Sequence, residues 1–153
     1  MIEVDQMETT WDKVVKVLVA IGGWLAGLFG GWSAQMGVLI GMMAADYVSG
    51  MMLAWLGKSP KTEGGGPSSK VGAQGIAKKF FMLLVVLAGA LVDQALGTGT
   101  TICRDAAIWF YIANEGLSLL ENVALSGLPF PQKLKDLLEQ AREKQGKPPD
   151  DEA

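Results

Sequence analysis

The residues that could do chemistry in this chain are carboxylates placed within strongly apolar segments. Asp46 and Asp93 each lie in a long stretch with almost no other charge, and Glu115 and Glu121 lie in a further apolar segment. Carboxylates at helical spacing can perform acid–base chemistry, but no nucleophile, metal-ligand set or phosphate-binding loop accompanies them. The chain has no His and one Cys, which excludes the usual His- or Cys-based metal sites. We therefore expect no enzyme, no metal site and no cofactor.

The chain has four apolar segments, and three of them contain these carboxylates. Half of the 153 residues are hydrophobic and only 19% are charged, with a mean hydropathy of +0.28. Roughly 20 apolar residues cross a bilayer as a helix, so the sequence predicts an all-α polytopic membrane protein. The expected spans are residues 14–32, 36–56, 80–96 and 102–125. Because only residues 33–35 separate the first two spans, we expect these to form a tight antiparallel hairpin.

The chain divides into three parts by composition. Residues 1–12 form an acidic N-terminus, which lacks the basic start of a cleavable signal, so we expect the first span to be retained. Residues 13–128 form the membrane domain, in which Gly, Pro, Ser and Lys make 57–79 a basic and largely flexible loop. Residues 129–153 form a charged tail, where leucines at helical spacing predict a short amphipathic helix from 132 to 145.

Basic residues indicate the orientation. The loop carries five lysines against one Glu, the 33–35 and 97–101 turns carry none, and the tail carries five further basic residues. The positive-inside rule then places the loop and both termini in the cytoplasm. The fourth span contains four charges, so a three-span alternative with 102–125 at the interface stays open. The lysines that set the topology are Lys58, Lys61, Lys70, Lys78 and Lys79.

Small residues recur about every four positions along the first two spans. In lipid, helices associate through close packing, and small residues allow two backbones to approach. These ladders could pack the hairpin of one chain, or they could also join copies into a homo-oligomer. The ladder residues are Gly23, Gly27, Gly31, Gly37, Gly41, Ala45 and Ser49.

Polar residues form a stripe on the fourth span, with further polar groups on the second and third. Such groups cannot comfortably face lipid. They could form a satisfied network, with Arg104 pairing with Asp93 or Asp105, or they could line a water-filled hole once copies assemble. The Lys-rich loop is more typical of a contact with anionic lipid than of a nucleic-acid site. The pore-lining candidates are Asp46, Asp93, Arg104, Asp105, Asn114, Glu115, Ser118, Glu121 and Asn122.

Three motifs resemble a known family. D-Y-V-S-G at 46–50 followed by Ala54, F-Y-I-A-N-E-G-L-S-L-L-E-N at 110–122, and G-L-P-F-P at 127–131 are similar to signatures of the toxin-secretion/phage-lysis holin family, phage holin family 4. The basic loop between the first two motifs also fits the family. The resemblance covers about residues 46–138.

The resemblance implies a multi-pass holin of the bacterial cytoplasmic membrane. Such proteins oligomerise with copies of themselves among membrane lipids and open lesions at a set time. An endolysin, or in some relatives a large toxin, then leaves the cell, and host-cell lysis follows. The family supplies no catalytic residues to carry over. Two alternatives remain from the residues themselves: a small ion or proton channel or transporter that uses the intramembrane carboxylates, and an accessory membrane subunit.

Overall fold

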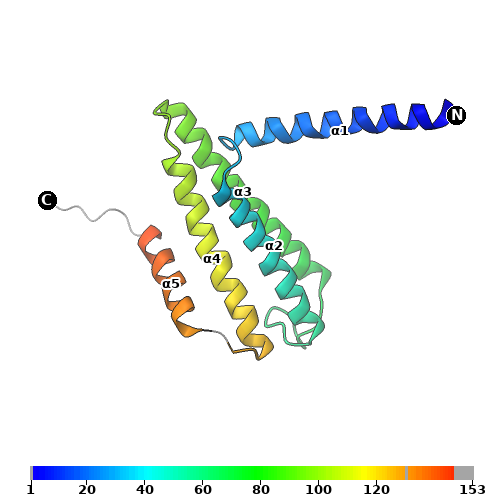
Figure 1. Cartoon of the computed structure of the whole chain (residues 1–153). Helices are drawn as coiled ribbons and strands as arrows, with labels where there is room; N and C mark the ends of the chain where they lie inside the picture. Colours follow the sequence, from blue (N-terminus) through cyan, green and yellow to red (C-terminus); the bar gives the residue numbers. More distant parts are fainter. Residues whose placement is uncertain (1, 130, 147–153) are drawn as a thin grey trace.

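The computed structural model of the chain describes residues 2–129 and 131–146, and within these the side chains of 2–9, 138 and 141–146 are not described (Figure 1). The described residues form helices and connecting loops with no strand, so the all-α prediction is confirmed. The predicted ends of the tail, residues 147–153, and Phe130 of the third motif lie outside the described residues. The helices are α1 (Ile2–Leu28), α2 (Ala34–Trp55), α3 (Ser69–Leu96), α4 (Ile102–Ser126) and α5 (Gln132–Gly146).

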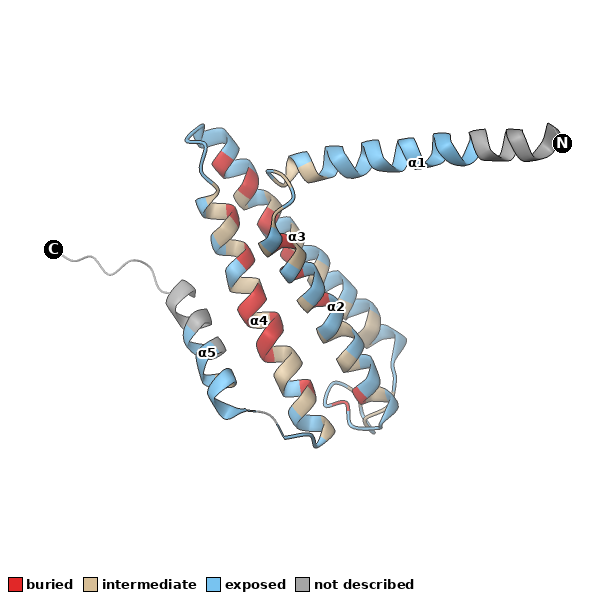
Figure 2. Cartoon of the chain, in the orientation of Figure 1, coloured by how far each residue is buried: buried red, intermediate tan, exposed pale blue. Residues whose placement is uncertain are grey.

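Helices α2, α3 and α4 form an up-down-up bundle, in which α3 runs antiparallel to α2 and α4 (Figure 1). α4 packs along both α2 and α3, whereas α2 and α3 contact each other at few positions. The buried side chains follow the inward faces of the three helices, as Figure 2 shows. The core between them contains Leu39, Met43, Val86, Ile108 and Ile112. α5 folds back beside α4.

The start of α3 corrects the predicted loop. Ser68 takes an extended conformation and caps a helix that begins at Ser69, so the connection from α2 is short and Lys70, Lys78 and Lys79 are all helical. The Gly- and Ser-rich composition predicted a flexible loop as far as Gly75, but the residues after Ser68 satisfy helical hydrogen bonding from their first turn. The third predicted span, 80–96, is therefore the second part of a longer helix.

Helix α1 corrects the predicted hairpin. It lies across one end of the bundle and points away from it (Figure 1), and in the described part of the chain it does not pack against α2. Gly30 and Gly31 adopt positive φ values of 74° and 91°, a left-handed conformation that glycine reaches without strain. This turn redirects the backbone, so the side chains of Trp11 to Leu25 are exposed on every side of α1 (Figure 2).

Two of the described helices, α2 and α3, are long and apolar enough by composition to cross a membrane. α4 was expected to be the least secure span because of its charges. It instead lies between α2 and α3 and turns Arg104, Glu115 and Asn122 into the bundle. The helix that lacks extensive packing within the chain is α1.

Candidate functional site

A buried ionic network joins the three helices of the bundle. The ammonium of Lys79, on α3, lies 2.7 Å from Oδ2 of Asp46, on α2, and also donates a hydrogen bond to Oε2 of Glu115, on α4. The side chain of Glu115 is only 2% exposed, and those of Asp46 and Lys79 are 12% and 15% exposed. Each helix therefore contributes one charged group to a shared site. We call Lys79, Asp46, Glu115 and Asn122 the polar network.

Asn122, about two turns after Glu115, also ties α4 to α2. Its Nδ2 donates to Oδ1 of Asp46 at 3.2 Å, to the Asp46 carbonyl at 3.3 Å and to Oγ of Ser49 at 2.9 Å. Ser118, one turn before Asn122, lines the same cavity as Asp46. Within the described residues, every buried side-chain nitrogen or oxygen has a hydrogen-bond partner. The network is thus satisfied inside one chain.

The charges of the polar network do not cancel. One ammonium faces two carboxylates, so the network carries a net charge of −1 when all three groups are ionised. Removing one partner from a buried ion pair leaves an uncompensated charge and costs about 3–5 kcal/mol. Lys79 is shared by both carboxylates, so it is the group on which the arrangement depends.

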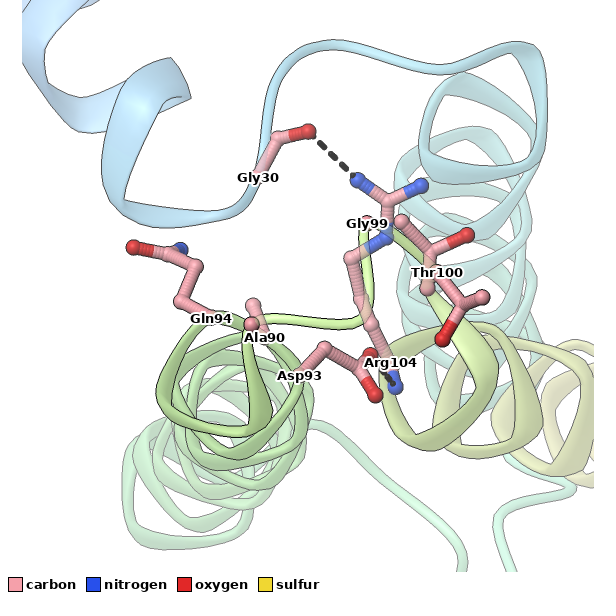
Figure 3. Close-up of a pocket in the computed structure, with 9 residues that line it drawn as sticks. Gly30, Ala90, Asp93, Gln94, Gly99, Thr100 and Arg104 are labelled. Carbon is pink, nitrogen blue, oxygen red and sulfur yellow. Dashed lines mark hydrogen bonds between the residues drawn. The ribbon is translucent and has the colours of Figure 1, made fainter.

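A second cluster lies at the opposite end of the bundle, where α1 joins it. Nη1 of Arg104 donates to the carbonyl of Gly30 at 3.0 Å (Figure 3) and to the carbonyl of Phe29 at the same distance. Gln94 of α3 donates to the carbonyl of Leu28 at 3.1 Å. The last carbonyls of a helix lack partners within it. Gln94 supplies a partner for the last carbonyl of α1, and Arg104 binds two carbonyls of the turn that follows; we call these two side chains the carbonyl clamp.

The remaining contacts of Arg104 settle which carboxylate it pairs with. Its Nη2 lies 3.0 Å from Oδ1 of Asp105, which forms the ion pair. Asp93 instead accepts the backbone N–H groups of Cys103 and Arg104 at 3.0 and 2.9 Å, and so caps the start of α4 from α3. A cavity of about 390 Å³ lies beside these groups and is lined by Asp93, Gln94 and Arg104 among others (Figure 3).

The structure divides the predicted polar stripe. Glu115, Ser118 and Asn122 face the interior, whereas Glu121 is exposed and Asn114 is only half-buried. Sequence reasoning treated Lys79 as a topology signal and missed its place in the network, and it did not single out Gln94. A charge count could have indicated Lys79, since carboxylates buried on neighbouring spans require a cation between them.

The glycine ladders do not pack one chain's own hairpin. A Cβ added at Gly23, Gly27 or Gly41 would meet no atom of the described chain within 4 Å. The close approach inside the bundle occurs at Gly89 of α3, where an added Cβ would lie 2.9 Å from the carbonyl oxygen of Cys103. In the described chain the ladders therefore do not pack α1 against α2, although Ser49 contacts Asn122 of α4, and assembly of copies through the ladders stays a prediction.

Comparison with known proteins identifies the family. The model of the bacteriophage holin family matches residues 23–143, which is more than half of the chain. An uncharacterized 14.9 kDa protein in the nagH 3′ region of Clostridium perfringens is 34% identical over 90% of this chain and 99% of its own length. The uncharacterized protein Lin0175 of Listeria innocua is 38% identical over 83% of this chain and 86% of its own length.

A phage protein is among the relatives. The probable holin of Bacillus phage phi105 is 31% identical over 61% of this chain and 63% of its own length. No solved structure matches the chain. The family match includes the bundle, the polar network and the carbonyl clamp, and it confirms the resemblance carried by the sequence motifs. The chain belongs to the bacteriophage holin family, a family of non-enzymatic membrane proteins.

Proposed function

We propose that this chain is a holin that assembles with copies of itself in the bacterial cytoplasmic membrane and opens lesions through which an endolysin reaches the cell wall. The observation that carries this proposal is the polar network, which is buried in a bundle whose outer surface is apolar. Exposed side chains on that surface include Val38, Val48, Phe81, Val85 and Trp109. Such a surface suits lipid, while the interior holds groups that water could also satisfy.

The polar network gives the bundle two ways to satisfy its buried groups. In the single chain, α4 meets the polar groups of α2 and α3, which hardly contact each other. If α4 rotated or moved outward, Glu115 and Asn122 would have to face a neighbouring copy or water, because lipid cannot satisfy them. Copies arranged in a ring could meet this requirement if the polar face of each α4 contacted water, and the water-filled centre of the ring would be the lesion. A large toxin is an alternative cargo for the same lesion.

We place the basic loop and the tail in the cytoplasm. Nζ of Lys58, in the loop, donates to the carbonyl of Ser126 at the end of α4 at 2.8 Å, so the loop and the start of the tail share one end of the bundle. Lysines concentrate at that end, as the positive-inside rule requires of a cytoplasmic face. α5 carries charges along its length, so we expect it to turn away from α4 and rest on the cytoplasmic surface.

We propose that α1 is a fourth span and that the N-terminus is also cytoplasmic. From Val14 to Leu28 the only charge is Lys16, so α1 has no polar face with which to lie along the membrane surface. A helix that is apolar on all sides suits the bilayer interior. The turn at Gly30 and Gly31 would have to swing α1 from its position across the bundle into line with α2.

Labelling of the N-terminus tests this topology. The variant carries Cys103→Ser and Thr10→Cys. A membrane-impermeant maleimide is added to whole cells in one sample and to lysed cells in another, and labelling of the cysteine at position 10 is compared. Four spans predict labelling only after lysis. Labelling on intact cells would show that α1 does not cross the membrane. A cysteine at Thr98, in the turn between α3 and α4, is the control that should label on intact cells.

Assembly through the α1 ladder is tested by crosslinking. Since Gly27 has open space around it in the single chain, Gly27→Leu should fold normally but hold neighbouring backbones apart, with Gly27→Ala intermediate. We expect fewer crosslinked oligomers and delayed lysis. Ala88→Leu, at an exposed position of α3 outside the ladders, is the matched control. Normal oligomers in Gly27→Leu would contradict the role of this ladder.

The function itself is tested by inducible expression together with a cytoplasmic endolysin. We expect abrupt lysis only when both proteins are present, with the endolysin activity passing into the periplasm. Passage of small ions without passage of a folded protein would favour the ion or proton channel instead. Dependence on a second host membrane protein would favour the accessory subunit.

A further inference from the structure

We propose that the cleft between α2 and α3 is a binding site for the headgroup of an anionic phospholipid from the cytoplasmic leaflet. The proposal rests on the membrane orientation proposed above, but not on the ability of the chain to open lesions. The site extends beyond the polar network, with which it shares Asp46, Lys79 and Asn122.

The cleft is a cavity of about 780 Å³ at the loop end of the bundle. It exists because α2 and α3 contact each other at few positions while both pack on α4. Its walls come from α2, the loop before α3, the first turns of α3, and Ser118 and Asn122 of α4. Apolar side chains form part of these walls, namely Met51, Leu53, Trp55, Val71 and Ile76. A space between two membrane helices with such apolar walls suits acyl chains.

The charges that line the cleft are mainly positive. The charged residues that line the cleft are Lys61, Lys78, Lys79 and Asp46, which give a net charge of +2. Lys79 is engaged by Asp46 and Glu115. Among the described residues, Lys61 and Lys78 form no ion pair, and both side chains are exposed. Two ammonium groups are thus available for a phosphate.

Hydroxyl groups complete the polar end of the cleft. Ser59 is buried and its Oγ accepts the backbone N–H of Lys61 at 3.3 Å, which fixes the loop against the cleft. Thr62 is held by a hydrogen bond from its hydroxyl to the carbonyl of Gly66 at 2.8 Å. Ser68 and Ser69 also line the cavity. The serine hydroxyls can donate to phosphate oxygens, and the Thr62 hydroxyl, which already donates to Gly66, can accept from a polyol headgroup such as glycerol.

The position of the cleft selects a lipid over a free anion. Cytoplasmic leaflets are anionic, and basic pockets between membrane helices on that side bind phospholipid headgroups. Inorganic phosphate would use the lysines but would leave the apolar walls exposed. A phospholipid with one net negative charge fits both the charge and the walls.

Fluorescence quenching tests the site with the full-length chain in neutral detergent. Trp55 lines the cleft, so phosphatidylglycerol with brominated acyl chains should quench it, and Trp55→Phe identifies its share of the signal. We expect saturable quenching by phosphatidylglycerol and much weaker quenching by brominated phosphatidylcholine. Each lysine near an anionic lipid strengthens binding about fivefold, so the double variant Lys61→Gln/Lys78→Gln should bind about 30-fold more weakly.

The control removes two lysines outside the cleft, as Lys133→Gln/Lys135→Gln, and should bind normally. Equal quenching by both lipids, or normal binding by the Lys61/Lys78 double variant, would overturn the proposal. Full displacement of the lipid by millimolar inorganic phosphate would show a site for the free anion instead. Lysis assays are read separately: lost lysis with intact lipid binding contradicts the holin function, and lost lipid binding with intact lysis contradicts only this site.

Discussion

Replacing Lys79 by Met should destabilise the bundle more than any other exchange of a single lysine. Met keeps most of the side-chain length and removes the charge, which leaves Asp46 and Glu115 buried without their shared cation. Breaking a buried ion pair from one side costs about 3–5 kcal/mol. That is a large fraction of the stability of a small domain, about 5–15 kcal/mol. We therefore expect unfolding of Lys79→Met at a much lower denaturant concentration.

The measurement is reversible unfolding in mixed micelles without anionic lipid, followed by far-UV circular dichroism. Lys78→Met is the matched control, since Lys78 is the preceding residue and is exposed. Surface substitutions usually change stability by no more than about 0.5 kcal/mol. Equal free energies of unfolding for Lys79→Met and Lys78→Met would refute the reasoning.

A double-mutant cycle separates the charge effect from lost packing. Glu115→Gln removes one carboxylate but keeps its shape and a hydrogen-bonding group. If the cost of Lys79→Met comes from uncompensated charge, Glu115→Gln should recover part of it, so the double variant is less destabilised than the sum of the two single variants. Contacting residues in one network show interaction energies of about 0.5–3 kcal/mol. An additive cycle would show that the ion pair contributes no coupling.

Two further predictions concern the contact between α3 and α4. Gly89→Ala should destabilise the bundle by about 1–3 kcal/mol, because the added Cβ would lie 2.9 Å from the Cys103 carbonyl oxygen. In the same unfolding assay Gly75→Ala is the control and should be tolerated, because its Cβ would meet only the Tyr47 ring at an ordinary contact distance. Asp93→Ala removes the acceptor for the N–H groups of Cys103 and Arg104, so amide hydrogen exchange in the first turn of α4 should be faster and the free energy of unfolding lower by about 0.5–2 kcal/mol. Thr98→Ala, in the exposed turn, should change neither quantity.

Apolar runs predicted the helices themselves well. The second predicted span, 36–56, corresponds to α2 at 34–55, and the fourth, 102–125, corresponds to α4 at 102–126. Both boundaries have local signals: Ser33 accepts the backbone N–H of Met36, and Gly127 ends α4 at a φ of 95°. The start of α3 was missed by eleven residues because composition outweighed the Ser68 cap.

Pairings between helices were harder to predict than helices. Lys79 follows a basic, Gly-rich segment and so looked like a topology signal, yet the longer α3 carries it into the bundle beside Asp46 and Glu115. The group that caps the start of α4 was equally hard to predict. Thr101 stands at the N-cap of α4 and makes no side-chain capping bond, while Asp93, eight residues earlier on another helix, does the capping. Both cases depend on which helix faces lie together.

The carbonyl clamp holds the connection from α1 to α2, residues 29–33, against the bundle. The turn itself satisfies earlier carbonyls of α1, since the N–H groups of Phe29, Gly30 and Gly31 donate to the carbonyls of Leu25, Gly27 and Ala26. Gln94 of α3 binds the last carbonyl of α1, Arg104 of α4 binds carbonyls of the turn, and α1 has few other contacts with the bundle. The angle between α1 and the bundle should therefore depend on these two side chains. A Cβ at Gly30 would lie 3.1 Å from Nη1 of Arg104, so the clamp also requires a small residue there.

Arg104→Met should release α1 while leaving the bundle folded enough to study. It removes the charged hydrogen bonds to Phe29 and Gly30, each worth about 1.5–3 kcal/mol. In a Cys103→Ser background, spin labels at Ala20 and Ala88 should report a broader distance distribution in nanodiscs. Asp105→Asn keeps the guanidinium on the carbonyls and should retain the narrow distribution. Unchanged width in Arg104→Met would mean that the lipid or a neighbouring copy, and not the clamp, sets the position of α1.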